Sequence, residues 1–271
     1  MPDRQSILHH GLGIVPDLDA HTYNMMEKYR VGDYMFGLPI STDGTSVLIA
    51  LKLYLRPFIV ARAMTIDRLA IEVTTAVANY TTGTAAFTNG SDQVVGTLTV
   101  FAASHVGARI KNDTDGEYHY IKSVEDATHL TLTATYSSTG GAAAAYTINH
   151  IARLGVYADN GSISPGALVK DYGVVSLSSV AIVAASADQQ LTKGINWLAA
   201  VIVGEAIVRI HLFSWSPLNG TVSYLMRYYS ACGHYEKGNV GTTPLADPCV
   251  SGLTACYSSA VGIVARLKSL D

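Results

Sequence analysis

The chain has 271 residues, of which 49% are hydrophobic and 14% are charged, and its formal net charge is −3. The hydrophobic fraction excludes a wholly disordered chain and suffices for one large domain or two smaller ones. The charged fraction lies below the usual value of about 25%, and the charge balance is negative. A nucleic-acid groove needs a clustered basic surface, so we expect no nucleic-acid partner. The apolar runs are shorter than the ~18 residues of a membrane helix, so we expect no membrane insertion.

The beginning of the chain differs from the rest. Its first ten residues, MPDRQSILHH, lack the basic start and the apolar segment of a signal peptide, so we expect synthesis in a cytoplasm without export by the general route. Residues 1–36 show little alternation of apolar and polar side chains. They predict an extended N-terminal arm that packs on a neighbouring subunit or on a particle surface, and a frayed terminus is the alternative.

Two-residue alternation follows the arm. In Leu51–Arg56, every second side chain is a leucine, and Arg68–Val73 and Glu205–Phe213 alternate in the same way. This pattern is typical of half-buried strands. Turn signals separate such runs at Asp43-Gly44, Asn89-Gly90, Asp115-Gly116, Asn160-Gly161 and Asn219-Gly220. The sequence therefore predicts an all-β protein with a sandwich or barrel fold.

The middle of the chain has a composition of its own. Residues 80–149 are rich in Thr, Ala, Gly and Asp, and they lie between two strand-like segments, Ile66–Ala78 and His150–Ala158. Five strands are expected within them: Thr97–Phe101, Ala108–Lys111, Tyr118–Val124, His129–Ala134 and Ala145–Ile148. We predict a small β-domain at 80–149 that is inserted into a β-sandwich formed by 37–79 and 150–271.

The segment after the insertion reads as a hairpin. In ARLGVYADNGSISPGALVKDYG, at 152–173, one strand ends at Asp159-Asn160-Gly161, a loop carries Ser164-Pro165-Gly166, and a second strand follows. The segment contains no catalytic motif. The G-x-S-x-G elbow of hydrolases is missing from the whole chain, and GLGIVP at 11–16 lacks the third glycine of a dinucleotide fingerprint. We predict no enzyme activity, no catalytic residue, no metal and no cofactor.

Two small clusters leave alternatives open. Asp113, Asp115 and Glu117 in D-T-D-G-E carry alternate carboxylates that could hold Ca²⁺. A polar hairpin turn is the favoured interpretation, because glycine stands fourth rather than sixth as in an EF-hand loop. The cysteines, Cys232, Cys249 and Cys256, form no C-x-x-C pair. Packing as small hydrophobic side chains is favoured, and a Cys249–Cys256 bridge stays open.

Aromatic residues are the candidates for a ligand or interface site. Aromatic rings stack against sugar rings and anchor protein interfaces. The alternative for an adjacent pair such as Tyr228-Tyr229 is one ring in the core and one on the surface. The candidates are Tyr34, Phe36, Trp215, Tyr228, Tyr229 and Tyr235.

Three stretches together resemble a β-sandwich of tailed-bacteriophage structural proteins, including tail-fibre, receptor-binding and head-fibre proteins. They are residues 37–76, 152–179 and 191–203. The likeness is carried by Ile66-Asp67-Arg68 with Leu69–Val73, by Arg153–Tyr157 with Asp159–Gly161 and Pro165–Leu168, and by Gly194, Trp197, Leu198 and Ala199. Asn196 stands where an aromatic residue is usual.

The resemblance implies a jelly-roll-like β-sandwich and a structural role in the virion, in the tail, a fibre or capsid decoration. It also implies a homo-oligomer, with a trimer favoured, and contacts with other virion proteins and a host-surface glycan. Shared fold does not establish shared role. A carbohydrate-binding module that uses Trp215 or Tyr229 is the second hypothesis. A glycan-degrading enzyme of the tailspike type is the third, although the repeats of a β-helix are missing.

Overall fold

The computed structural model describes residues 31–35, 42–47, 50–60, 62–162, 164–203, 207–212, 234–237, 244–249, 251–256 and 259–270. Side chains are described in these ranges except at 42–47, 187, 207, 209–212, 234–237, 254–256 and 259–261. Strands dominate, and the one helical turn in these ranges is η1 (Ala103–His105). The all-β prediction is confirmed. Within the same ranges, no helix is long and apolar enough to cross a membrane. Most of the predicted arm, residues 1–30 and Phe36, lies outside the described residues.

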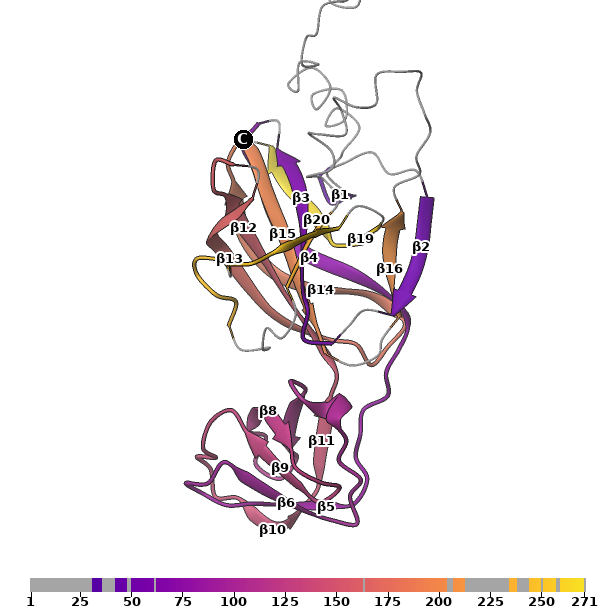
Figure 1. Ribbon diagram of the computed structural model, residues 1–271, viewed down its shortest axis with the longest axis vertical. Coiled ribbons are helices and arrows are strands. Elements are labelled where there is room, and N and C mark those ends of the chain that lie inside the picture. The colour runs from indigo at the N-terminus through magenta and orange to yellow at the C-terminus, as the bar shows by residue number, and fades with distance from the viewer. Residues whose placement is uncertain are drawn as a thin grey trace, which may run out of the picture.

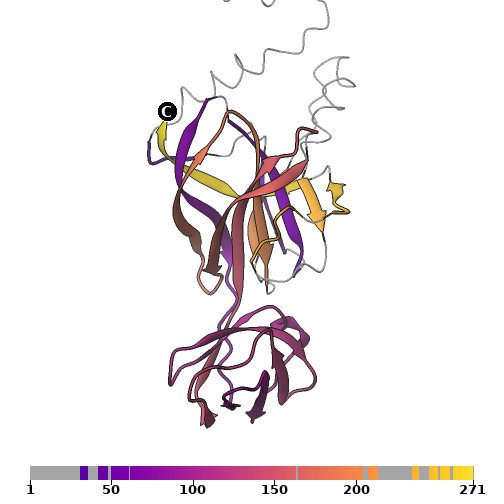
Figure 2. The same ribbon diagram turned by 90° about the vertical axis from the view of Figure 1, so that its left-hand side faces the viewer.

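The molecule has two lobes, a larger β-sandwich and a smaller lobe below it (Figures 1 and 2). The sandwich consists of two antiparallel sheets. The first has the order β1-β20-β4-β16-β19, with β14 paired to β4 and β2 paired to β16. Its strands are β1 (Tyr34–Met35), β2 (Thr42–Val47), β4 (Met64–Thr75), β14 (Ala181–Leu191), β16 (Ile207–Leu212), β19 (Ser259–Val261) and β20 (Val264–Leu270).

The second sheet has the order β13-β12-β15-β3-β17-β18. Its strands are β3 (Leu53–Val60), β12 (Ile151–Asp159), β13 (Pro165–Ser176), β15 (Gly194–Ile202), β17 (His234–Lys237) and β18 (Thr254–Cys256). The predicted hairpin at 152–173 is β12 and β13, joined by a short loop in which Asp159 Oδ2 accepts a hydrogen bond from Gly161 N at 2.8 Å. The sandwich is consistent with the predicted class, and its jelly-roll connectivity stays a prediction.

The main core lies between the two sheets. Apolar side chains of β4 and β20 meet those of β3, β12 and β15, among them Phe58, Leu69 and Leu154. Strand β4 shifts register against β14 and β20 near Asp67. Met64 and Ile66 face the core before the shift and Leu69 faces it afterwards. A bulge of this kind redirects side chains.

The central strands of the second sheet, β3, β12 and β15, are buried on both faces. The outer face of the sheet carries Leu53, Leu55 and Trp197, which pack against residues 244–249 and 251–253, here called the strap. The prediction of a half-buried strand at Leu51–Arg56 is therefore wrong for β3. Tyr54 and Arg56 point the other way and are buried too, and Arg56 Nη1 donates to Ile263 O at 3.3 Å.

Polar contacts fix the strap on the sheet. Tyr157 Oη donates to Ala246 O at 3.0 Å, and Asp247 Oδ1 accepts a hydrogen bond from Leu168 N at 2.9 Å. Gly155 makes room for the strap, because a Cβ at this position would lie 2.2 Å from Leu245 Cδ1. The strap thus packs into the space that Gly155 leaves on the outer face of the second sheet.

The smaller lobe, here called the module, is a sheet with the order β10-β5-β6-β9-β8-β7-β11. Its strands are β5 (Thr84–Phe87), β6 (Gln93–Thr97), β7 (Arg109–Asn112), β8 (Tyr118–Val124), β9 (His129–Leu132), β10 (Gly141–Ala144) and β11 (Tyr146–Asn149). Strands β10 and β11 stand at the two ends of this order, yet only Ala145 separates them in the chain. The sheet therefore curls round on itself and encloses an aromatic core that includes Phe87, Tyr136 and Tyr146.

One predicted strand of the module is wrong. The sequence predicts a strand at Thr97–Phe101, but β6 spans Gln93–Thr97 and ends there. Leu98 has a φ of 57°, in the left-handed region, so the backbone turns away there. The side chains of Leu98 and Val100 are exposed as a result, at 84% and 63%.

Candidate interaction surfaces

The structure describes two of the predicted aromatic candidates in part. Tyr34 lies on β1 at the edge of the first sheet, half-buried and paired with Arg266. Tyr235 lies on β17 of the second sheet, opposite Leu55, and its side chain is not described. These two residues belong to different sheets. Phe36, Trp215, Tyr228 and Tyr229 lie outside the described residues.

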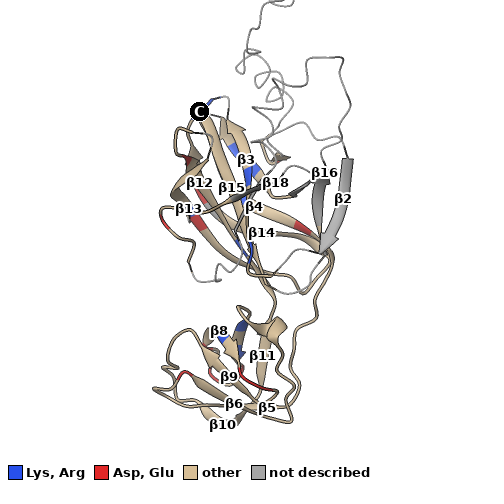
Figure 3. Ribbon diagram, in the orientation of Figure 1, with Lys and Arg blue, Asp and Glu red and all other residues tan. Residues whose placement is uncertain are grey.

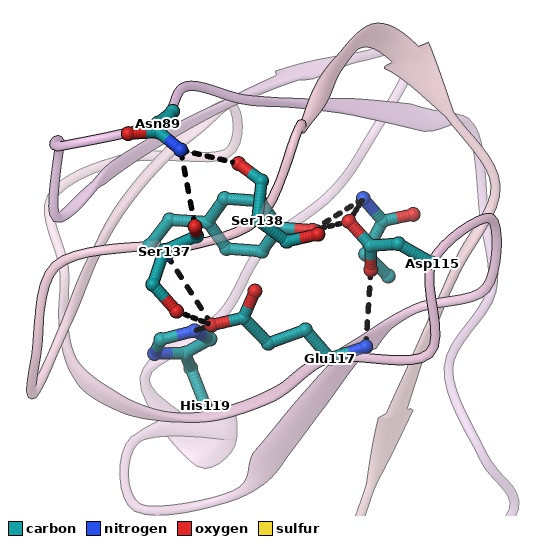
Figure 4. A network of polar contacts seen from close by, with 8 residues as sticks. Asn89, Asp115, Glu117, His119, Ser137 and Ser138 are labelled. Carbon is teal, nitrogen blue, oxygen red and sulfur yellow. Dashed lines mark hydrogen bonds and ion pairs between the residues drawn. The ribbon is translucent and has the colours of Figure 1, made fainter.

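The D-T-D-G-E turn joins β7 to β8 and is held by a polar network (Figure 4). Asp115 Oδ2 accepts hydrogen bonds from Tyr136 Oη and from Asn112 Nδ2, the latter at 3.2 Å. Glu117 Oε1 accepts from Ser137 Oγ at 2.7 Å and lies 2.7 Å from His119 Nε2. The turn is thereby tied to the segment that follows β9.

Each carboxylate of the turn already has protein partners. Asp113 accepts a hydrogen bond from Thr147 Oγ1 at 2.8 Å and lies 3.3 Å from Lys111 Nζ. The hydrogen bond from Ser137 contributes most to lowering the pKa of Glu117. Among the described residues, no group of three or more His, Cys, Asp or Glu side chains is placed to hold a metal ion. These contacts favour the interpretation as a polar turn.

The side chain of Cys256 is not described. Whether Cys249 and Cys256 form a disulfide bridge therefore stays open.

A second surface lies on the opposite face of the same hairpin. In the β7–β8 register, Arg109 stands opposite Tyr120 and Lys111 opposite Tyr118. Their neighbours Ile110 and Ile121 are buried in the module core, so Arg109, Lys111 and Tyr118 lie on the other face of the hairpin. Tyr120 packs against the core cluster at the junction with the sandwich. We call Arg109, Lys111, Tyr118 and Lys122 the basic–aromatic face.

Cations and rings touch on this face. Arg109 Cζ lies 4.1 Å from the ring centroid of Tyr118, and Lys111 Nζ lies 5.8 Å from it. Arg109 and Lys122 form no ion pair with any residue that the structure describes. The Nε of Arg109 is buried without a hydrogen-bond partner. Positive charge on this face is therefore only partly balanced.

Sequence reasoning missed the basic–aromatic face, although a signal was present. Arg109 and Lys111 alternate in one predicted strand, and Tyr118, Tyr120 and Lys122 alternate in the next. The predicted turn at Asp115-Gly116 joins the two strands as a hairpin, which places alternate residues of both on one face. The combination of the two patterns would have indicated the face.

The module and the sandwich meet through shared contacts. Ile151 and Val203, which belong to the sandwich, are buried in the module core. Arg153 on β12 donates through Nη2 to Tyr120 Oη at 3.4 Å and through Nη1 to Asp171 Oδ2 at 2.8 Å. Asp171 Oδ2 also accepts from Leu245 N of the strap at 3.1 Å. One ion pair therefore connects the module, the sandwich and the strap.

Two histidines are buried at the same junction. The rings of His105 and His150 lie 5.9 Å apart, and the ring of Tyr80 lies 4.7 Å from that of His105. Burial lowers the pKa of both imidazoles, and the charge of His150 lowers the pKa of His105 further. Both histidines are therefore held neutral in the folded protein at neutral pH.

Acidification is expected to destabilise the junction. Because the pKa of each histidine is lower in the folded protein, the unfolded chain binds more protons than the folded one as the pH falls. The stability that the neutral histidines contribute is therefore fully present above the ordinary histidine pKa of about 6.5. It is lost as the pH falls through the pKa values of the folded protein. The melting temperature should be level above about pH 7 and should fall below about pH 6.5. The pair His105→Gln with His150→Gln should reduce this fall, whereas exposed His129→Gln should leave it unchanged. An identical fall in the double variant would contradict the assignment.

No protein-family model, no curated protein and no solved structure matches the chain. The class of the protein is therefore defined by its fold and surfaces. It is an all-β protein with a two-sheet sandwich, a strap over the outer face of the second sheet and a curled β-module.

Proposed function

We propose that the chain is a non-enzymatic structural protein of a tailed-bacteriophage particle, in its tail, a fibre or its capsid decoration. The proposal rests on where the three stretches that resemble such proteins lie in the sandwich. They contain β4, β12, β13 and β15, which belong to both sheets of the sandwich. The quoted residues have structural roles: Trp197 Nε1 donates to Asp159 Oδ1 at 3.0 Å, and Asp67 Oδ1 accepts from Arg266 Nε at 2.9 Å.

The arrangement of the lobes supports a role at a particle surface. The chain leaves the sandwich at the end of β4 and returns at the start of β12, so both connections to the module lie at one end of the sandwich. Strand β20 runs the other way, with Leu270 paired to Met64 at the start of β4 (Figure 1). We propose that the end of the sandwich remote from the module attaches to the particle, so that the module projects from it.

Self-association is part of the proposal. Strand β14 pairs with β4 alone among the described strands, and Val180 and Ile182 beside this edge are exposed. An edge strand with few charges is a template for pairing with another chain. We propose a homo-oligomer with a trimer favoured, located in the virion and in contact with other virion proteins.

Light scattering of the full chain tests the oligomer. The expected mass is a multiple of the single-chain mass, with three copies favoured, and it should persist on dilution through the micromolar range. A single-chain mass at every concentration would contradict self-association of the isolated chain.

A carbohydrate-binding module is the second candidate function. The exposed ring of Tyr118 beside the cations of β7 favours it, since tyrosine offers an apolar ring with a polar tip. Reproducible binding to one class of sugar on a glycan array, by a chain that is missing from particles, would favour this candidate.

A further inference from the structure

We infer that the basic–aromatic face of the module binds an acidic polysaccharide, a sugar chain that carries carboxylate or phosphate groups. The inference rests on the proposed function insofar as a projecting module would meet the host surface. Figure 3 shows Lys and Arg gathered around β8 in the smaller lobe.

Charge is the first argument. The chain as a whole is negative, with a net charge of −3, yet this face carries three cations on two adjacent strands. Asp113 is the one carboxylate that pairs with them in the described part of the chain. Arg109 and Lys122 are thus left to attract an anion, and the planar fork of a guanidinium matches the geometry of a carboxylate or phosphate.

The exposed ring is the second argument. Tyr118 is 47% exposed while Arg109 lies 4.1 Å from its ring centroid. The cation fixes the orientation of the ring, and the exposed remainder offers an apolar surface against which a sugar ring can stack. Cations and a ring together match a ligand that has both a charged group and an apolar face.

The patch favours a sugar chain over a nucleic acid. Bases also stack on aromatic rings, but nucleic-acid binding needs a basic track along many phosphates. The face is compact, with cations at 109, 111 and 122. A few anionic groups on a short saccharide match it better than a duplex does.

The face is preorganised for binding. Its residues lie on paired strands above the buried side chains of Ile110 and Ile121. The turn that joins the strands is held by the network of Asp115, Tyr136 and Glu117 (Figure 4). A backbone fixed in this way holds the side chains of the face at set positions, which lowers the conformational entropy lost when a ligand binds.

Binding of the full chain to defined saccharides tests the inference. The saccharide probes are oligogalacturonate, which carries carboxylates, dextran phosphate, which carries phosphates, and neutral dextran. Duplex DNA is the fourth probe. Calorimetry should detect binding to at least one acidic probe, weakening with added salt, and no comparable binding to neutral dextran. The more tightly bound acidic probe identifies the anionic group.

Variants locate the binding. Arg109→Ala and Lys122→Ala should each weaken the affinity for the acidic probe about tenfold, in line with the loss of a charge-assisted contact. Tyr118→Ala should weaken it several-fold. Lys268→Ala, which removes an exposed cation of the sandwich, is the matched control and should leave the affinity unchanged. Melting temperatures should confirm that the variants are folded.

Four outcomes would overturn the inference. They are no binding of either acidic probe at ~1 mM, equal binding of neutral dextran, equal binding of duplex DNA, and variants of the face that bind as the original chain does. Each leaves the proposed structural role intact, because the presence of the chain in particles is measured separately. Absence from particles with specific saccharide binding would instead overturn that role and retain the site.

Discussion

Trp197→Ala should lower the free energy of unfolding of the sandwich by about 3–5 kcal/mol. The Trp197 side chain is completely buried on the outer face of the second sheet, in the cluster with Leu53, Leu55 and the strap residue Leu245. Its removal leaves a cavity beneath the strap. It also removes the indole donor that binds Asp159 Oδ1 at 3.0 Å, at the start of the β12–β13 loop.

Chemical denaturation followed by circular dichroism measures this loss, since the substitution removes a fluorescent side chain. The control is Val100→Ala in the module, where the side chain is 63% exposed and the change should stay within about 0.5 kcal/mol. A loss of less than about 1 kcal/mol for Trp197→Ala would mean that the strap does not seal this face.

Asp171→Asn should cost about 3 kcal/mol, the lower end of the range for removing one partner of a buried ion pair. Arg153 is buried and donates to Asp171 Oδ2 at 2.8 Å. The same carboxylate accepts hydrogen bonds from Gly173 N at 2.8 Å and from Leu245 N at 3.1 Å. An amide offers one acceptor oxygen in place of two and sets an NH₂ group against these donors.

The matched control for this substitution is Asp188→Asn. Asp188 pairs with Lys268 at the surface, where both side chains are about half exposed, and such pairs contribute about 0–1 kcal/mol. Denaturation curves of the two variants give the comparison. Equal losses at the two positions would contradict a central role of Asp171 at the junction.

Local patterns were sufficient for several elements that depend on nearby residues, although Asp43-Gly44, predicted as a turn, lies within strand β2. The β12–β13 hairpin follows from the Asp159-Asn160-Gly161 turn between two apolar segments, and β8 has the predicted bounds, Tyr118–Val124. Alternation and turn residues act within about ten residues of one another, so the sequence displays them directly.

Long-range contacts explain what the sequence did not predict. The outer face of β3 is covered by the strap, which lies about 190 residues later in the chain. An alternating strand predicts that one of its faces is buried. No pattern within the strand itself indicates that another segment covers the second face. Arg56 reads as a surface residue for the same reason, although it is buried against the carbonyl of Ile263.

The candidate site also depends on contacts between strands that local sequence patterns do not display. The composition predicts single aromatic residues as the site, and most of these residues lie outside the described part of the chain. The basic–aromatic face arises from the pairing of two strands, which sets Lys111 beside Tyr118 and Arg109 beside Tyr120. Cross-strand neighbours are the unit of such a surface, and they become visible once the register is known.

The presence of the chain in purified particles tests the central proposal most directly. Phage particles from the culture that expresses the chain are separated on a density gradient and analysed by quantitative mass spectrometry, with gold-labelled antibodies against the module for electron microscopy. The proposal predicts several copies per particle and labels on the particle exterior. A chain found in the soluble lysate alone, with unlabelled particles, would contradict it.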